Sequence, residues 1–309
     1  MATHTVLVLN DPAAGHMKVL DRLPAGTRVV ISDRAADFAG IAAEADVLIV
    51  GAVPRALAEE VWPMAPNVKW VHSLAAGLDT VLFPELITSP VPLTNSRGVF
   101  AHSLAEFAIS GMLWFAKELN RMRRQQAEGR WEKFSVTELR GAKLGVVGHG
   151  AIGRATAALA VDFGMEVCGL GRTHTREELE EVLTQSDFLL IGAPLTPQTR
   201  GMLGETELRM MKRTAVLINL GRGPVVVEEA LIRALSDGTI RGAVLDVFDV
   251  EPLPAGHPFW GMDNVLLSPH CSDNTATWLD DAMGLLLDNF NRYAAGQPLR
   301  NVTTKELGY

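Results

Sequence analysis

The sequence predicts an α/β protein made of two doubly wound, parallel-sheet domains. Short β-branched runs alternate with helical segments along the whole chain, which is typical of strand–helix–strand units. The apolar character within each run is continuous rather than alternating, as in strands that helices cover on both faces. The chain has 309 residues, enough for two domains of roughly 150 residues each.

The predicted strands fall into two series separated by a long helical stretch. The first series covers residues 5–10, 28–33, 45–51 and 68–74. The second series covers residues 143–149, 166–172, 188–194, 215–221, 243–248 and 265–270. Because each series supplies enough strands for its own sheet, we expect one sheet in each domain.

Composition and charge narrow the classes of partner. A net charge of −8, from 28 Lys and Arg against 36 Asp and Glu, argues against nucleic acid as a partner. Two cysteines, Cys168 and Cys271, are too few for a disulfide framework and suit a reducing compartment. Residues 1–10 lack the features of a signal peptide, and the most apolar helical stretch, 107–115, is far shorter than the ~20 residues that span a bilayer. A cytoplasmic protein without a membrane partner is therefore expected, and no residue is assigned to a metal.

A long apolar helix is predicted between the two series of strands. Ser103 and Glu106 have the S-x-x-E spacing of a capping box, which predicts a helix start near Ser103. Residues 104–119 are apolar on nearly all sides, so this helix must be buried on nearly all sides. It is either wedged between the two domains or also covered by a partner subunit, and we predict a contact with a second copy of the chain.

A glycine-rich loop follows the first strand of the second series. Gly148, Gly150 and Gly153 form the pattern G-x-G-x-x-G between a predicted strand and a predicted helix. The first glycine permits a tight turn, the second lets the backbone approach a pyrophosphate, and the third lets helix and strand pack closely. The helix N-terminus favours the anion. The loop therefore predicts dinucleotide binding; the alternative is a glycine-rich turn in a domain without a ligand.

The end of the next strand indicates which dinucleotide binds. An NAD-specific fold places Asp or Glu there to accept hydrogen bonds from the ribose 2′-hydroxyl. This strand instead ends in Gly171, Arg172 and Thr173. A guanidinium binds a 2′-phosphate in a bidentate manner, and Thr173 can donate a further hydrogen bond. NADP(H) is predicted over NAD(H); the alternative is that Arg172 stacks on the adenine and both cofactors bind.

Polar side chains follow three later strands of the second series. Arg222, Glu251 and His270 lie after predicted carboxyl ends, where ligands of open α/β sheets bind. Arg222 would hold a substrate carboxylate. His270 would exchange a proton near neutral pH, and Glu251 would orient its ring. Next to a nicotinamide, these three residues form a set for hydride transfer.

The chain resembles the D-isomer-specific 2-hydroxyacid dehydrogenases over nearly its whole length. The segments that carry the resemblance are AAGLD (75–79), NSRGVFAHSLAEFAI (95–109), GAKLGVVGHGAIGR (141–154), PLTPQTRGML (194–203), NLGRGPVVVEEAL (219–231), AVLDVFDVEPL (243–253) and NVLLSPH (264–270).

The resemblance implies a role for each matching residue. Arg222, Glu251 and His270 fall on the catalytic positions of the family, and Asp246 falls on the residue that binds the nicotinamide carboxamide. Ala76 and Gly77 fall on the loop whose amides hold the substrate carboxylate. Cofactor-contacting backbone positions fall on Ala151, Ile152, Ala193, Leu220 and Gly221. Cys271 and Asp273 depart from the more usual small or apolar residues after the histidine.

The resemblance also implies an architecture. Residues 1–98 and 278–309 would form a flavodoxin-like substrate domain, and residues 99–277 a Rossmann cofactor domain, with a cleft that closes on binding. Members of the family are usually dimers built through the long helix, which agrees with the helix starting near Ser103.

The implied reaction is reduction of a small 2-oxo acid to its D-2-hydroxy acid by NADPH, and the reverse oxidation. Glyoxylate and hydroxypyruvate are the leading substrates, and a bulkier 2-oxo acid is an alternative. Formate oxidation is disfavoured because that type has Gln where Glu251 stands. A corepressor-like protein that senses dinucleotides without turnover is a further alternative.

Overall fold

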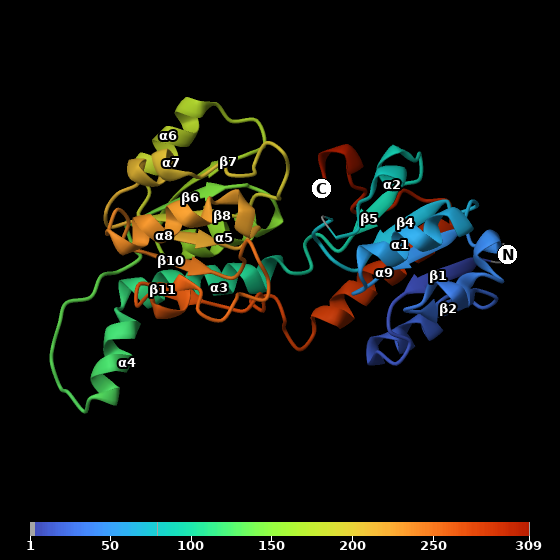
Figure 1. Ribbon diagram of the computed structural model, residues 1–309, viewed down its shortest axis with the longest axis horizontal. Helices are drawn as coiled ribbons and strands as arrows, with labels where there is room; N and C mark the ends of the chain where they lie inside the picture. The colour runs from blue at the N-terminus through green and yellow to red at the C-terminus, as the bar shows by residue number, and fades with distance from the viewer. Residues whose placement is uncertain (1–3, 79, 309) are drawn as a thin grey trace. The chain divides into compact units, whose positions relative to one another are not determined.

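The computed structural model describes residues 4–78 and 80–308, which divide into two compact units. One unit contains the described chain up to Phe100 together with the segment from Ala276 onwards, and the other contains Ala101–Thr275. Each unit is built around one wholly parallel sheet, coloured blue to teal in one and green to orange in the other (Figure 1). The predicted fold class is confirmed.

The first unit has a five-stranded sheet in the order β2-β1-β3-β4-β5. The order reverses at β1, because β2 lies on one side of it and β3 on the other, as in flavodoxin-like sheets. The strands are β1 (Thr5–Leu9), β2 (Arg28–Ser32), β3 (Val47–Val50), β4 (Trp70–Ser73) and β5 (Leu93–Asn95). Strand β5 was not predicted, because its apolar pattern covers only three residues.

Helices complete the first unit on both faces of its sheet. Trp70 and Phe290 belong to the core on one face, where the C-terminal helix α9 packs. Leu48 and Leu57 belong to the core on the other face. The α-helices are α1 (Arg55–Val61), α2 (Pro84–Thr88) and α9 (Trp278–Ala294), and the short 3-10 helices are η1 (Gly15–Arg22), η2 (Ala35–Phe38), η3 (Ala42–Glu44), η4 (Trp62–Met64) and η7 (Lys305–Leu307).

The second unit has a six-stranded sheet in the order β11-β10-β9-β8-β6-β7. Its strands confirm the second predicted series with shorter bounds. They are β6 (Lys143–Val147), β7 (Glu166–Leu170), β8 (Phe188–Ile191), β9 (Val216–Asn219), β10 (Gly242–Leu245) and β11 (Val265–Leu267). The strand order reverses at β6, which has β7 on one side and β8 on the other.

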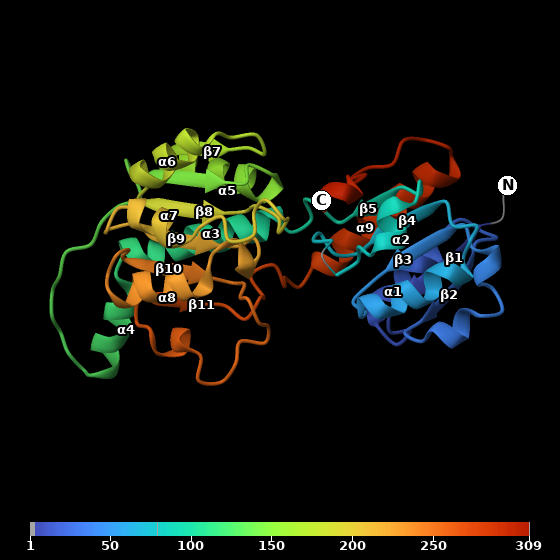
Figure 2. The same cartoon turned by 45° about the horizontal axis from the view of Figure 1, so that its top comes forward.

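Two layers of helices cover this sheet (Figure 2). On one face, Leu189 and Leu245 pack with the helices α6, α7 and α8. On the other face α3 approaches closely, because a Cβ on Gly111 would lie 2.8 Å from Val244. The α-helices are α3 (Ala101–Ala116), α4 (Leu119–Ala127), α5 (Ala151–Asp162), α6 (Arg176–Gln185), α7 (Glu205–Met210) and α8 (Glu228–Ser236), and the short 3-10 helices are η5 (Gly223–Val225) and η6 (Pro258–Gly261).

The predicted start of the long helix is wrong by two residues. Helix α3 begins at Ala101, so Ser103 lies inside its first turn and is not the cap. The Ser103 hydroxyl donates instead to the backbone oxygen of Ser272, at 2.6 Å. Glu106 pairs with His102 one turn earlier, at 3.2 Å. Ser103 and Glu106 therefore do not form a capping box. Ser103 contacts a loop, and Glu106 forms a surface pair with His102.

The helix also ends earlier than predicted. Residue Glu118 adopts a left-handed conformation with φ of 54°, and a separate helix, α4, follows it. Arg241 explains the break, since its guanidinium donates to the Phe115 oxygen at 2.7 Å and pairs with Glu118. Helix α4 and the loop after it extend away from the sheet of this unit (Figure 1). None of the helices in the described ranges is long and apolar enough to cross a membrane.

Candidate active site

The glycine-rich loop follows β6, the strand at which the strand order of the second sheet reverses. Gly148 has φ of 97°, and a Cβ there would lie 2.4 Å from the amide nitrogen of Ala193, which follows β8. A Cβ on Gly153 would meet the Gly148 oxygen at 2.5 Å. A Cβ on Gly150 would meet nothing within 4 Å. The first and third glycines are therefore required by close packing, and the second faces open space.

The start of α5 suits an anion. Gly150 is its N-cap and gives no side-chain cap, so the first amides of the helix, from Ala151 and Ile152 onwards, are left for a ligand. The open space beside Gly150 lies at this same point. These residues fit the pyrophosphate of a dinucleotide.

The next strand, β7, ends at Leu170, and an exposed turn follows it. Arg172 and Thr173 lie in this turn, and His174 contacts the Gly171 oxygen at 3.0 Å. No carboxylate stands at positions 171–174. The turn therefore provides a guanidinium and a hydroxyl where an NAD-specific fold has an acid.

The loops after β8, β9 and β10 pack directly on one another. A Cβ on Gly221 would lie 2.6 Å from the Ala193 oxygen, and the buried Leu220 donates its amide to Ile191. Asn219 holds the turn before Arg222, because its side chain accepts from the Gly221 amide and donates to the Arg222 oxygen, both at 3.1 Å. Asn219 is therefore a residue that fixes the backbone of Arg222.

Glu251 and His270 are in direct contact. The His270 Nδ1 lies 2.7 Å from the Glu251 Oε2, and the side chains are 40% and 36% exposed. The other carboxylate oxygen of Glu251 accepts from the Phe248 amide at 2.9 Å. His270 has φ of 51°, in the left-handed region that few residues other than glycine adopt. The imidazole thus has Nδ1 engaged by a carboxylate, which leaves Nε2 to exchange a proton.

Asp246 fixes the loop that carries His270. Its side chain is 1% exposed, and one carboxylate oxygen accepts from the amides of Cys271 and Ser272 at 3.0 and 3.2 Å. The other oxygen accepts from the Ser272 hydroxyl. These three hydrogen bonds hold the backbone immediately after His270. A contact of Asp246 with a nicotinamide remains a prediction.

Asp273 adds a carboxyl group to the same neighbourhood. Partial burial raises its pKa, and the nearby Asp246 charge acts in the same direction. His270 and Arg222 oppose that rise, which places Asp273 within electrostatic range of both. Cys271 is exposed, and its sulfur lies 3.5 Å from the Ser268 hydroxyl.

Ala76 and Gly77 lie in the first unit, in the loop after β4. Both are half-buried, and the Asn95 side chain donates to the Ala76 oxygen at 2.6 Å. The next residue but one, position 79, falls outside the described residues. A role of Ala76 and Gly77 in holding a substrate carboxylate remains a prediction.

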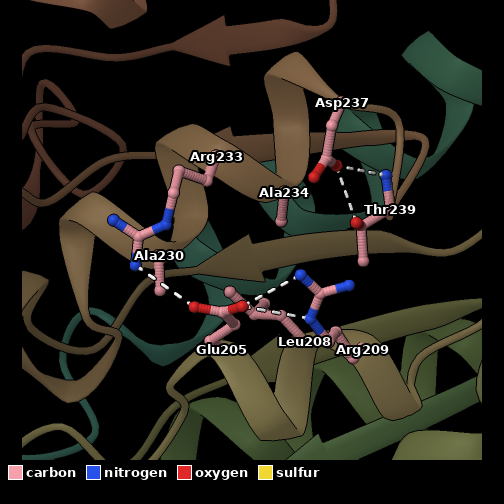
Figure 3. A pocket seen from close by; sticks show the side chains of 8 residues that line it. All are labelled: Glu205, Leu208, Arg209, Ala230, Arg233, Ala234, Asp237 and Thr239. Carbon is pink, nitrogen blue, oxygen red and sulfur yellow. Dashed lines mark hydrogen bonds and ion pairs between the residues drawn. The ribbon is translucent and has the colours of Figure 1, made fainter.

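A separate hollow lies between α7 and α8, and its charged side chains pair with one another (Figure 3). Glu205 pairs there with Arg209 at 2.9 Å and with Arg233 at 3.5 Å. Asp237 accepts from Thr239. These charged and polar side chains bind one another, so we do not consider this hollow a candidate active site. Within residues 4–78 and 80–308, no group of three or more His, Cys, Asp or Glu could hold a metal ion.

The chain is similar to several known proteins. A model of the family described as "D-isomer specific 2-hydroxyacid dehydrogenase, NAD binding domain" matches residues 109–272. A glyoxylate reductase of Aeropyrum pernix is 35% identical over 263 residues, which cover 79% of this chain and 78% of the relative.

Solved structures agree over the whole length. A D-isomer-specific 2-hydroxyacid dehydrogenase of Xanthobacter autotrophicus, in complex with NADPH and MES, is 32% identical with a TM-score of 0.86 and full coverage of both chains. An NADPH-dependent glyoxylate/hydroxypyruvate reductase of Sinorhizobium meliloti, in complex with NADP and sulfate, is 25% identical with a TM-score of 0.85, covering 99% of this chain and 100% of that chain. The chain therefore belongs to the D-isomer-specific 2-hydroxyacid dehydrogenases, a family of enzymes that bind a nicotinamide dinucleotide.

Proposed function

We propose that the protein reduces a small 2-oxo acid to its D-2-hydroxy acid with NADPH, with glyoxylate and hydroxypyruvate as the leading substrates. The observation that carries the proposal is the 2.7 Å contact between His270 Nδ1 and Glu251 at the carboxyl edge of the second sheet. The glycine-rich loop follows β6 and Arg222 follows β9, so both come after the carboxyl ends of strands in the same sheet. Relatives named as glyoxylate and hydroxypyruvate reductases support this class of substrate.

In the proposed mechanism, each side chain has one task. Arg222 binds the substrate carboxylate through paired, charge-assisted hydrogen bonds. His270 gives a proton from Nε2 to the carbonyl oxygen, and Glu251 holds the ring through Nδ1. The nicotinamide, when bound, supplies the hydride. Reduction therefore needs protonated His270, and the reverse oxidation needs it neutral.

The preference for NADPH rests on Arg172 and Thr173. Both are exposed after β7, in a turn without an acid that would repel a 2′-phosphate. The Xanthobacter and Sinorhizobium structures carry NADPH and NADP. NAD(H) is the alternative cofactor, with Arg172 stacked on the adenine.

A binding measurement separates the two cofactor proposals. Calorimetric titration with 2′,5′-ADP and with 5′-AMP should give tighter binding of the 2′-phosphorylated ligand. Arg172→Ala should remove most of that difference and leave 5′-AMP binding unchanged. Equal binding of the two ligands by the unaltered protein would contradict the NADPH preference without touching the reductase chemistry.

The reductase proposal is tested by oxidation of NADPH and NADH at 340 nm. The panel contains glyoxylate, hydroxypyruvate, pyruvate, 2-oxoisovalerate and phenylpyruvate. We expect turnover of glyoxylate and hydroxypyruvate, at a higher rate with NADPH than with NADH. Turnover of phenylpyruvate alone would move the protein to a bulkier 2-oxo acid. If the protein binds NADPH but turns over none of these acids, the proposal is overturned, and a role in sensing dinucleotides is favoured.

We also propose a cytoplasmic homodimer formed through α3. Phe107, Leu113 and Trp114 are half-buried on the side of α3 that also exposes His102, Glu106 and Ser110. Beyond α4, the side chain of Trp131 is 93% exposed. A second copy covering both would remove this apolar surface from water. The free thiols of Cys168 and Cys271 suit the reducing cytoplasm.

A further inference from the structure

A more buried histidine–glutamate pair, His257 and Glu228, lies next to the turn that carries Glu251. The His257 Nε2 is 3.0 Å from the Glu228 Oε1, and the side chains are only 13% and 21% exposed. The pair is therefore more buried than His270 and Glu251. Glu228 lies in the first turn of α8, and His257 immediately precedes η6.

The proton on His257 has a fixed place. Its Nδ1 accepts from the Phe259 amide at 3.3 Å, so Nδ1 carries no hydrogen. The hydrogen of the neutral ring is then on Nε2, which donates to Glu228. The Phe259 ring packs against the imidazole with 4.8 Å between ring centroids. His257 is thus a rigid donor aimed at one carboxylate oxygen.

The other oxygen of that carboxylate holds the backbone of the Glu251 turn. Glu228 Oε2 accepts from the Asp249 amide at 3.3 Å. The neighbouring amide, of Phe248, donates to Glu251. Consecutive amides of one turn therefore bind Glu251 on one side and Glu228 on the other.

The same turn supports Arg222. Gly223, directly after the arginine, packs so tightly on this turn that a Cβ would lie 2.1 Å from the carbonyl carbon of Phe248. A shift of residues 248 and 249 would therefore move both the backbone next to Arg222 and the Phe248 amide that donates to Glu251.

We propose that Glu228 and His257 are positioning residues that hold Glu251, and through it His270, in the geometry for proton transfer. The inference rests on the proposed reductase function. Proton transfer needs its groups placed within a few tenths of an ångström. Glu251 accepts from the Phe248 amide and contacts His270, and the Glu228–His257 pair fixes the turn that provides the first of these contacts.

The first test replaces Glu228 by Gln. A carboxylate accepts from two donors, whereas an amide has one acceptor oxygen and turns its NH2 group toward the second donor. We expect kcat for glyoxylate reduction to fall ~10- to 100-fold, with KM and the dissociation constant for NADPH changed less than twofold. Glu229→Gln is the matched control, because Glu229 is exposed on the same turn of α8 and should leave all three constants unchanged.

Two changes at His257 separate positioning from general loss of structure. Gln places a donor near the Nε2 position and should keep most of the activity. Asn mimics the acceptor Nδ1 but cannot reach Glu228, so it should behave like Glu228→Gln. Equal activity of the two variants, both folded by circular dichroism, would overturn the proposal, as would a Glu228→Gln effect confined to KM.

A readout without turnover keeps this test independent of the substrate assignment. With ¹⁵N-labelled histidine, the Nδ1 resonance of His270, assigned by its loss in His270→Gln, should shift in Glu228→Gln and stay in place in Glu229→Gln. If the unaltered protein reduces no 2-oxo acid, the reductase proposal fails, while a shifted resonance would still support the positioning role. An unshifted resonance would contradict that role whatever the enzyme reduces.

Discussion

At the scale of single residues, the proposed chemistry depends on one imidazole with two differently used nitrogens. Glu251 engages His270 Nδ1 at 2.7 Å, and the left-handed backbone of His270 is held by the bonds of Asp246 to the next two residues. A strained conformation persists only where its surroundings over-determine it. Asp246 therefore determines where the His270 ring can lie.

Replacing His270 by Ala should lower kcat for 2-oxo acid reduction by ~10²–10⁴-fold, the loss typical of a missing general acid. NADPH binding should change little, because the glycine-rich loop contacts other residues. Stopped-flow measurement of NADPH oxidation and fluorescence titration of NADPH would provide the two numbers. An unchanged rate, in an assay limited by the chemical step, would rule out His270 as the acid.

His72 gives the first unit a dependence on pH that is separate from catalysis. Its ring is fully buried in β4, Nδ1 is 2.7 Å from the Thr94 hydroxyl, and Nε2 has no partner among the described residues. Burial lowers its pKa from 6.5 to about 3. Between these values the unfolded chain binds a proton that the folded chain excludes.

The stability that His72 contributes is therefore fully present above pH 6.5 and declines as the pH falls towards 3, by at most ~1.4 kcal/mol per pH unit. His72→Gln should narrow the fall in the melting temperature of the first unit between pH 7 and pH 5. Scanning calorimetry of both proteins at several pH values provides the comparison. Equal falls in the two proteins would show that other groups account for the acid sensitivity.

At the scale of elements, the loop between β6 and α5 separates the requirements of folding from those of binding. Gly148 is required by its positive φ and by the Ala193 backbone, whereas Gly150 faces open space at φ −80°. Gly148→Ala should destabilise the second unit by ~1–3 kcal/mol.

Gly150→Ala should leave the melting temperature nearly unchanged and weaken NADPH binding at least tenfold, because its methyl group fills space that the cofactor needs. Calorimetry and NADPH titration of both variants test this contrast. Normal NADPH affinity in Gly150→Ala would mean that the pyrophosphate does not approach at this point.

The elements also show how far the sequence alone could predict this fold. Buried parallel strands were predictable, because their continuous apolar runs leave few alternatives. The three-residue strand β5 carries too short a pattern. The end of α3 was not predictable, since Arg241, distant in sequence, caps it through the Phe115 oxygen. The start was mistaken because the spacing of Ser103 and Glu106 has the same form inside a helix as at its cap.

The candidate site shows the same division. Arg222, Glu251 and His270 could be singled out because polar residues after buried strands gather at one edge of a parallel sheet. Glu228 and His257 carried no such signal, because a glutamate in the first turn of a helix is common for reasons of charge alone. Only the fold brings Glu228 to the Asp249 amide.

At the scale of the whole molecule, the proposed dimer accounts for apolar surface on the second unit. Light scattering should give a mass of twice the 33.4 kDa chain. Phe107→Glu, on the half-buried face of α3, should yield a monomer by placing a charge in the interface. Trp260→Ala, a change at a 57% exposed side chain on η6, is the control and should remain dimeric. A monomeric unaltered protein would refute the proposed assembly.

The most direct test of the central claim is the configuration of the product. Hydroxypyruvate is suited to it because its reduction creates a stereocentre, whereas glyoxylate gives achiral glycolate. Chiral chromatography after incubation with NADPH should show D-glycerate alone from the unaltered protein and almost none from His270→Ala. L-Glycerate or a racemic product, or undiminished formation of D-glycerate by His270→Ala, would contradict the proposed roles of Arg222, Glu251 and His270.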